Sequence, residues 1–113
     1  MITIYNNPRC RKSREGLEIL EKSGREFEKR EYLKEPLKEE ELENLISKLQ
    51  IAPIQLVRKN ESIWKENYRD RDLSDRELIS ILAENPKLIE RPVVENEKKA
   101  VIGRPPSNIE KIL

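Results

Sequence analysis

The stretch that decides the fold is residues 2–33, ITIYNNPRCRKSREGLEILEKSGREFEKREYL. Ile2–Tyr5 is a short apolar run of strand-forming residues, and an Asn-Asn-Pro turn signal ends it. Arg11–Lys22 then carries leucines at helical spacing and stops before Gly24, a residue typical of helix C-caps. Phe27–Leu33 is a second, more highly charged strand candidate. Strand, helix and strand within about thirty residues predict a βαβ unit with a parallel strand pair.

The middle of the chain has the pattern of amphipathic helices. From Pro36 onward, apolar residues recur at the i, i+3, i+4 and i+7 positions of a helix. A second apolar run follows Ser74, which begins a Ser-x-x-Glu capping box, and an Asn-Pro pair ends it at Pro86. We therefore expect a helical insertion over about residues 36–85.

The last third of the chain returns to β structure. Leu88–Val94 and Ala100–Ile102 flank a polar turn and predict an antiparallel hairpin, and Ser107–Leu113 has the apolar spacing of a short final helix. This order predicts a single α/β domain over residues 1–113, with the thioredoxin-like (glutaredoxin-like) mixed sheet and a helical insertion. The alternative is that the middle helices pack against one ordinary α/β sheet layer.

The composition excludes several classes of function. Lys and Arg total 23 against 22 Asp and Glu, a balance that indicates neither nucleic acid nor a membrane surface as partner. Without histidine, the chain can form no Ser-His-Asp triad, no Cys-His pair and no Cys/His zinc site, so we expect no metal and no bound cofactor. One cysteine permits no internal disulfide. A free thiol, no signal peptide and no membrane-spanning run together predict a cytoplasmic protein.

That cysteine, Cys10, follows the first predicted strand and lies at or near the start of the first helix. Free backbone N–H groups and the positive end of the helix dipole favour the thiolate there. Four cations close in sequence should favour it too: Arg9, Arg11, Lys12 and Arg14. The pattern predicts a nucleophilic thiolate. The alternative is a structural cysteine that packs as a small hydrophobic residue.

Cys10 begins a C-x-x-S sequence that ends at Ser13. The second, resolving thiol of a C-x-x-C pair is therefore missing, and any covalent adduct on Cys10 must be released by an external thiol. The Ser13 hydroxyl is placed to donate a hydrogen bond to the sulfur from the first turn of the helix.

Three arginines stand in unusual positions. Arg91 precedes Pro92 inside an apolar run, where proline marks an edge strand, a bulge or a cis bond. Arg104 lies in a rigid Gly-Arg-Pro-Pro turn, and Arg58 ends an apolar stretch. Each one alone is most simply a surface arginine. Together with Cys10 they predict an oxyanion site, because guanidinium groups match the geometry of tetrahedral oxyanions.

Four motifs, in order along nearly the whole chain, resemble those of the glutaredoxin-dependent arsenate reductases. They are Asn7-Pro8-Arg9-Cys10 with Ser13-Arg14, Leu56-Val57-Arg58-Lys59-Asn60, Ile89-Glu90-Arg91-Pro92-Val93-Val94 after Asn85-Pro86, and Ile102-Gly103-Arg104-Pro105-Pro106. The resemblance implies a thioredoxin-like fold with a helical insertion. It also implies that Cys10 attacks arsenate, that Ser13 and Arg14 support the thiolate, and that Pro92 is the cis-proline beside the thiol.

The resemblance further implies that Arg58, Arg91 and Arg104 hold the oxyanion and the arsenical adduct on the sulfur. Glutathione, as co-substrate, would form a mixed disulfide, and glutaredoxin would reduce it and regenerate the enzyme. The sequence departs from the family at Asn6, where histidine is often found. Asn6 carries no charge, so Arg9, Arg11 and Lys12 are expected to compensate.

Two other functions are compatible with this fold. Redox-sensing transcription regulators that bind RNA polymerase share it, but they typically carry C-x-x-C, so Ser13 and the Gly103-Arg104-Pro105 motif favour the reductase. A glutathione-dependent oxidoreductase that acts on another substrate is the second alternative.

Overall fold

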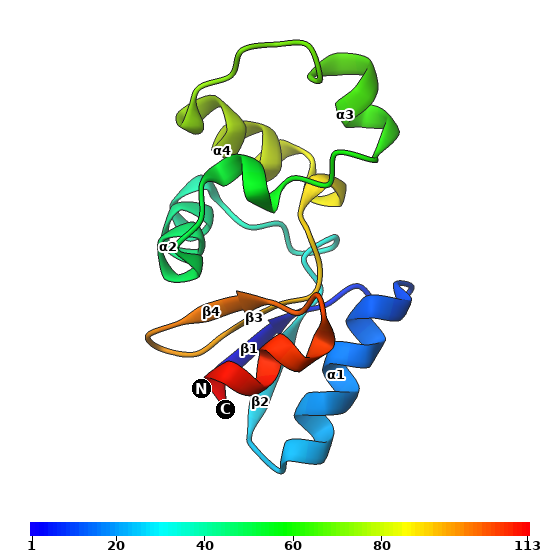
Figure 1. The fold of residues 1–113 in the computed structure, drawn as a ribbon, viewed down its shortest axis with the longest axis vertical. Helices are drawn as coiled ribbons and strands as arrows, with labels where there is room; N and C mark the ends of the chain where they lie inside the picture. The colour runs from blue at the N-terminus through cyan, green and yellow to red at the C-terminus, as the bar shows by residue number, and fades with distance from the viewer. The chain divides into compact units, whose positions relative to one another are not determined.

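A mixed four-stranded sheet is the centre of one of the two units into which the chain divides (Figure 1). The computed structural model describes residues 1–113. The first unit joins Met1–Glu35 to Arg91–Leu113, and the second is Pro36–Glu90. The second unit occupies the stretch expected to form a helical insertion, about residues 36–85, and continues to Glu90.

The sheet has the order β2-β1-β3-β4. β1 (Ile2–Tyr5) pairs in parallel with β2 (Phe27–Arg30), and α1 (Arg11–Ser23) connects the two strands. On its other side β1 pairs antiparallel with β3 (Val93–Glu95), which forms an antiparallel hairpin with β4 (Ala100–Ile102). A parallel βαβ unit joined to an antiparallel hairpin is the thioredoxin-like arrangement, so the predicted fold class is confirmed.

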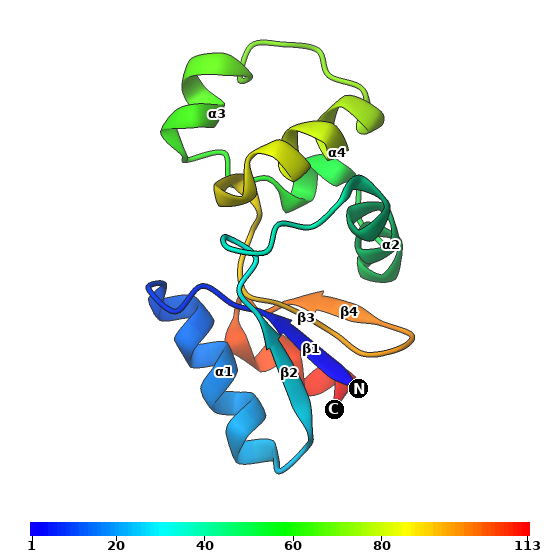
Figure 2. The ribbon, with the colours of Figure 1, turned by 180° about the vertical axis from the view of Figure 1, so that it is seen from behind.

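One face of the sheet carries the core of the first unit. α1 and the 3₁₀ helix η3 (Pro106–Ile112) lie side by side along this face, as Figures 1 and 2 show. Ile4 is the register partner of Val94, so both side chains point to the same face. The buried residues of this core are Ile2, Ile4, Leu20, Val94, Ile109 and Ile112.

Three predicted element boundaries were wrong. The strand expected to run to Leu33 ends at Arg30 and is followed by a turn. The strand expected over Leu88–Val94 is much shorter, because Pro92 has no N–H for a strand ladder and β3 begins only after it. The final helix has 3₁₀ geometry and starts directly after Pro105.

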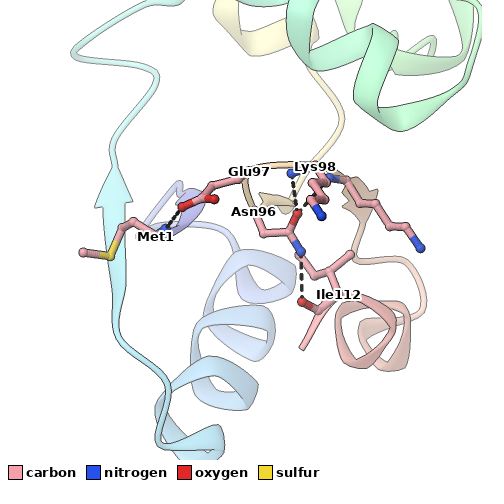
Figure 3. A network of polar contacts seen from close by, with 6 residues as sticks. Met1, Asn96, Glu97, Lys98 and Ile112 are labelled. Atoms are coloured by element: carbon pink, nitrogen blue, oxygen red, sulfur yellow. Dashed lines mark hydrogen bonds and ion pairs between the residues drawn. The ribbon is translucent and has the colours of Figure 1, made fainter.

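The turn between β3 and β4 is closed by one asparagine side chain (Figure 3). Asn96 Oδ1 accepts hydrogen bonds from the backbone N–H of Lys98 at 2.8 Å and of Lys99 at 2.7 Å, while Nδ2 donates to the Ile112 carbonyl at 3.1 Å. The Met1 amino group pairs with Glu97 at 3.3 Å. Asn96 thus ties the end of η3 to the hairpin.

The second unit is helical. It contains α2 (Glu39–Leu49), η1 (Pro53–Leu56), α3 (Ser62–Asn67), α4 (Asp75–Glu84) and η2 (Pro86–Leu88). The helix expected from Pro36 begins three residues later, at Glu39. None of the helices in the structure combines the length and the apolar character needed to cross a membrane.

The predicted capping box at the start of α4 is confirmed. Ser74 Oγ accepts a hydrogen bond from the Glu77 N–H at 3.1 Å, and the Glu77 carboxylate accepts one from the Ser74 N–H at 3.0 Å. These bonds lower the pKa of Glu77. The box orients the buried face of α4, which packs against α2 and η1.

Candidate active site around Cys10

Cys10 is the N-cap residue of α1. Its backbone is extended, with φ −95° and ψ 123°, and its carbonyl accepts the N–H of Arg14 at 3.1 Å as the first turn of the helix begins. Its own N–H donates to the Asn7 carbonyl at 2.9 Å, which closes the short turn that leads from β1. The thiol is therefore held, half-buried, at the positive end of a 13-residue helix whose first turn contains no acidic residue.

The side chain that contacts the sulfur is that of Arg91. Arg91 Nε donates a hydrogen bond to Cys10 Sγ at 3.1 Å, although the residues are 81 positions apart. The sheet explains the contact, because Val93 is paired with Tyr5 in antiparallel register. Residues just before Val93 therefore lie beside the segment that follows Tyr5 and leads to Cys10.

The environment of Cys10 favours the thiolate. Burial raises the pKa of the Cys10 thiol, but interactions of the sulfur with the backbone N–H of Ser13, the side chain of Arg91 and the backbone N–H of Lys12 lower it, and the charge of Arg91 lowers it further. Together these interactions lower the pKa of the Cys10 thiol from its ordinary value. Such surroundings are typical of a nucleophilic thiol and differ from those of a cysteine that packs as a hydrophobic residue.

Two of the arginines close to Cys10 in sequence, Arg11 and Arg14, have other partners. Arg11 forms an exposed ion pair with Glu15 at 3.3 Å, and Arg14 Nη1 donates to the Pro8 carbonyl at 3.2 Å. Arg14 thus braces the turn before the cysteine, and its guanidinium supports the thiol only indirectly. The cation that lowers the pKa of Cys10 comes from a distant part of the chain.

Two buried side-chain oxygens near this end of α1 and β1 have no hydrogen-bond partner. They are Ser13 Oγ, in a residue with no exposed surface, and Asn6 Oδ1, in a residue that is 5% exposed. The hydrogen bond expected from the Ser13 hydroxyl to the sulfur is therefore absent, and Ser13 acts on the thiol through its backbone N–H.

Pro92 follows Arg91 in the chain, and Gly103, the residue before Arg104, is hydrogen-bonded to Pro92. The Arg91–Pro92 peptide bond is cis, as the resemblance implied. The Gly103 N–H donates to the Pro92 carbonyl at 2.8 Å, and this bond extends the β3–β4 pairing by one step. Arg104 follows Gly103, and its N–H donates to the Ile102 carbonyl at 2.9 Å, so the chain turns out of the strand pairing there. Arg104 is exposed, and its carbonyl accepts a hydrogen bond from Asn108 at 3.2 Å.

Arg58 belongs to the second unit. Its guanidinium pairs with Glu61 at 2.9 Å and donates to the Lys87 carbonyl at 3.3 Å. Its backbone N–H donates to the Leu88 carbonyl at 2.7 Å, beside an isolated bridge between Val57 and Ile89. Within this unit, then, Arg58 is a half-buried, ion-paired residue. The structure contains no group of three or more His, Cys, Asp or Glu side chains that could hold a metal ion.

Comparison with known proteins gives consistent matches. The model of the ArsC family matches residues 5–112. The chain is 42% identical over 114 residues to the uncharacterized protein YfgD of Escherichia coli, with 99% of this chain and 96% of that protein covered. It is 40% identical over 114 residues to an arsenate reductase of Haemophilus influenzae, with 99% and 98% covered. An arsenate reductase structure from Vibrio cholerae superimposes with a TM-score of 0.94 at 41% identity, covering 99% of this chain and 97% of that one.

Proposed function

The chain belongs to the ArsC family, and we propose that it reduces arsenate to arsenite through a covalent adduct on Cys10. The observation that carries the proposal is the hydrogen bond of 3.1 Å from Arg91 to the Cys10 sulfur at the start of α1. This contact joins the nucleophile to a guanidinium suited to the oxyanion that the nucleophile attacks. The proteins named arsenate reductase that match almost the full chain support arsenate as the oxyanion.

In the first step, the Cys10 thiolate attacks the arsenic of arsenate. An As–S bond forms and one oxygen of arsenate leaves as water after it takes up protons. Arg91 has five N–H donors, so it can bind an arsenate oxygen while it remains beside the sulfur. We propose that Arg104, which directly follows the hydrogen bond between Gly103 and Pro92, supplies a second guanidinium to the same oxyanion.

In the second step, glutathione supplies the electrons. Its thiolate attacks the Cys10 sulfur, so an S–S bond forms and the As–S bond breaks. The electron pair of the As–S bond stays on arsenic, which leaves as arsenite. Arsenic is thereby reduced by two electrons, and the two thiols are oxidised to one mixed disulfide. Because Cys10 is the only cysteine, an external thiol must then reduce that disulfide by thiol–disulfide exchange, and we propose that glutaredoxin supplies it.

A coupled assay tests this function. The purified protein is mixed with arsenate, glutathione, glutaredoxin, glutathione reductase and NADPH, and NADPH oxidation is followed. We expect oxidation that depends on arsenate and is lost in the Cys10→Ser variant. Phosphate in place of arsenate should give none, because it accepts no electrons from thiols. If arsenate gives no turnover while a mixed disulfide substrate does, the protein is a glutathione-dependent oxidoreductase with another substrate.

A further inference from the structure

We propose that Gly16 and Gly103 are positioning residues for the Arg91–Cys10 pair. Their missing side chains leave the space in which Pro92 packs, and Pro92 in turn sets the distance from the Arg91 guanidinium to the sulfur. The inference rests on the site of the proposed function, but it concerns the state of the thiol and not the substrate.

Gly16 lies on the buried face of α1, six residues after Cys10. A Cβ added there would stand 2.8 Å from Pro92 Cγ and 3.0 Å from Ile109 Cδ1. Real Cβ atoms essentially never approach another heavy atom as closely as 2.8 Å. Alanine at position 16 therefore forces Pro92, Ile109 or the helix itself to move.

Gly103 contacts the same two side chains. A Cβ on Gly103 would lie 2.9 Å from Pro92 Cγ and 3.1 Å from Ile109 Cδ1. The Gly103 N–H also donates to the Pro92 carbonyl at 2.8 Å. The Pro92 ring, which is fully buried, is thus confined by one glycine on α1 and one glycine after β4.

Backbone conformation does not explain either glycine. Among the glycines of the chain only Gly24, at the end of α1, has a positive φ, of 74°. A glycine inside a helix costs about 1 kcal/mol relative to alanine, so Gly16 lowers the stability of α1. The close approach of Pro92 explains why a residue without a side chain stands there all the same.

A displacement of Pro92 by an added Cβ would be passed directly to Arg91 and Cys10. Pro92 is bonded directly to Arg91, and the clashing atom on α1 would belong to the helix that begins at Cys10. Movement of Pro92 away from α1 therefore separates Arg91 from Cys10. A hydrogen bond of 3.1 Å weakens steeply when it lengthens or loses its alignment, so a shift of a few tenths of an ångström is enough to be measured.

The test is the pH dependence of Cys10 alkylation in Gly16→Ala. We expect the midpoint of the profile to rise, so that at a pH below both midpoints the rate falls about threefold or more, in proportion to the lost thiolate. In an Arg91→Ala background, Gly16→Ala should cause no further rise, because the contact that it disturbs is already gone. Gly24→Ala is the matched control, since it strains the end of the same helix but lies far from Pro92.

An unchanged alkylation midpoint in folded Gly16→Ala would overturn the proposal. So would a rise caused by Gly16→Ala in the Arg91→Ala background that equals its rise in the natural sequence. If Gly16→Ala does not fold, Gly103→Ala is measured in the same way, and Ile109→Val is added to either variant to remove one clashing methyl group. No variant is judged by arsenate turnover. A protein that shows the expected shifts but does not reduce arsenate would therefore contradict the proposed function alone.

Discussion

At the scale of single residues, the side chain that contacts the Cys10 sulfur lies 81 positions away in sequence. Because the pKa of Cys10 is lowered, the midpoint of its alkylation profile should lie at a lower pH than that of an unperturbed cysteine. Arg91→Ala removes a hydrogen bond and a positive charge from the thiolate, so the midpoint should rise. Below both midpoints the rate should fall severalfold, in proportion to the thiolate that is lost.

Arg11→Ala is the matched control for that measurement. Arg11 is adjacent to Cys10 in sequence, but its side chain is 85% exposed and paired with Glu15. Its removal should leave the alkylation profile nearly unchanged, because exposed charges are screened by solvent and salt. Equal effects of Arg11→Ala and Arg91→Ala would show that local charge density, and not the Arg91 contact, activates the thiol.

The two arginines of the hairpin should matter most to catalysis. Arg91 is part-buried beside the sulfur, and loss of one charge-assisted contact in a desolvated site costs about 2–5 kcal/mol, so Arg91→Ala should lower kcat/KM for arsenate by orders of magnitude. Arg104→Ala should lower it to a smaller extent, because Arg104 is exposed. Lysine at either position should restore activity only in part, because an ammonium group lacks the bidentate geometry. Thermal melting serves as the control. Normal kcat/KM in both alanine variants would show that Arg91 and Arg104 take no part in binding the oxyanion.

Arg58 requires a separate prediction, because only the resemblance assigns this residue to the oxyanion site. If it takes part in catalysis, Arg58→Ala should lower kcat/KM for arsenate far more than Glu61→Ala, which removes only its ion-pair partner. If the Arg58–Glu61 pair is purely structural, the two variants should lose similar amounts of thermal stability and keep similar activity. The comparison of kcat/KM and Tm in the two variants separates the two roles.

The sequence pointed to Cys10 and Arg91 as members of one site, and the structure brings these two together, but two of the cations that it placed beside the thiol do not contact the sulfur. Arg11 and Arg14 are close to Cys10 along the chain, yet each has a partner elsewhere. The direction of a long side chain depends on those partners, which are known only when the fold brings them together. The same reason hid the absence of a Ser13 hydroxyl bond to the sulfur.

At the scale of elements, helix termini were more predictable than strand ends. Ser74 and Gly24 act through local geometry, a capping hydrogen bond and a positive φ, which residue types indicate directly. The strand expected over Leu88–Val94 is not formed along its full length, because its first apolar residues are buried in irregular structure. Leu88 ends a 3₁₀ turn, and Ile89 forms only an isolated bridge with Val57. Burial alone does not distinguish a strand from a packed irregular segment.

The capping box gives an element-scale prediction. Ser74→Ala removes the acceptor for the Glu77 N–H, so the free energy of unfolding should fall by about 1 kcal/mol, with a lower Tm. Ser74→Asn, which can also accept this bond, should retain most of the stability. Cys10 alkylation should not change, since the cap belongs to the second unit. A shift in the alkylation midpoint would show that α4 influences the thiol.

At the scale of the whole molecule, the sequence patterns led us to expect a single domain with a helical insertion over about residues 36–85, and the structure divides into two units. Alternating strand-like and helix-like periods before Pro36 and after Arg91 correspond to the sheet unit, and the helical period between them corresponds to the second unit. What no pattern could show is that Pro92 packs against Gly16 and Gly103, since a glycine kept for space looks the same in a sequence as a glycine kept for flexibility.

The last prediction concerns the reductant, which follows from a chain with only one cysteine. After one turnover with arsenate and glutathione, but without glutaredoxin, Cys10 should carry a stable glutathione mixed disulfide, because no second thiol in the chain can displace it. Mass spectrometry of the intact protein should show one glutathione adduct, which glutaredoxin removes. Thioredoxin in place of glutaredoxin should support much slower turnover. Rapid arsenate reduction with thioredoxin alone, and no glutathione adduct at any stage, would show that the electrons follow another route.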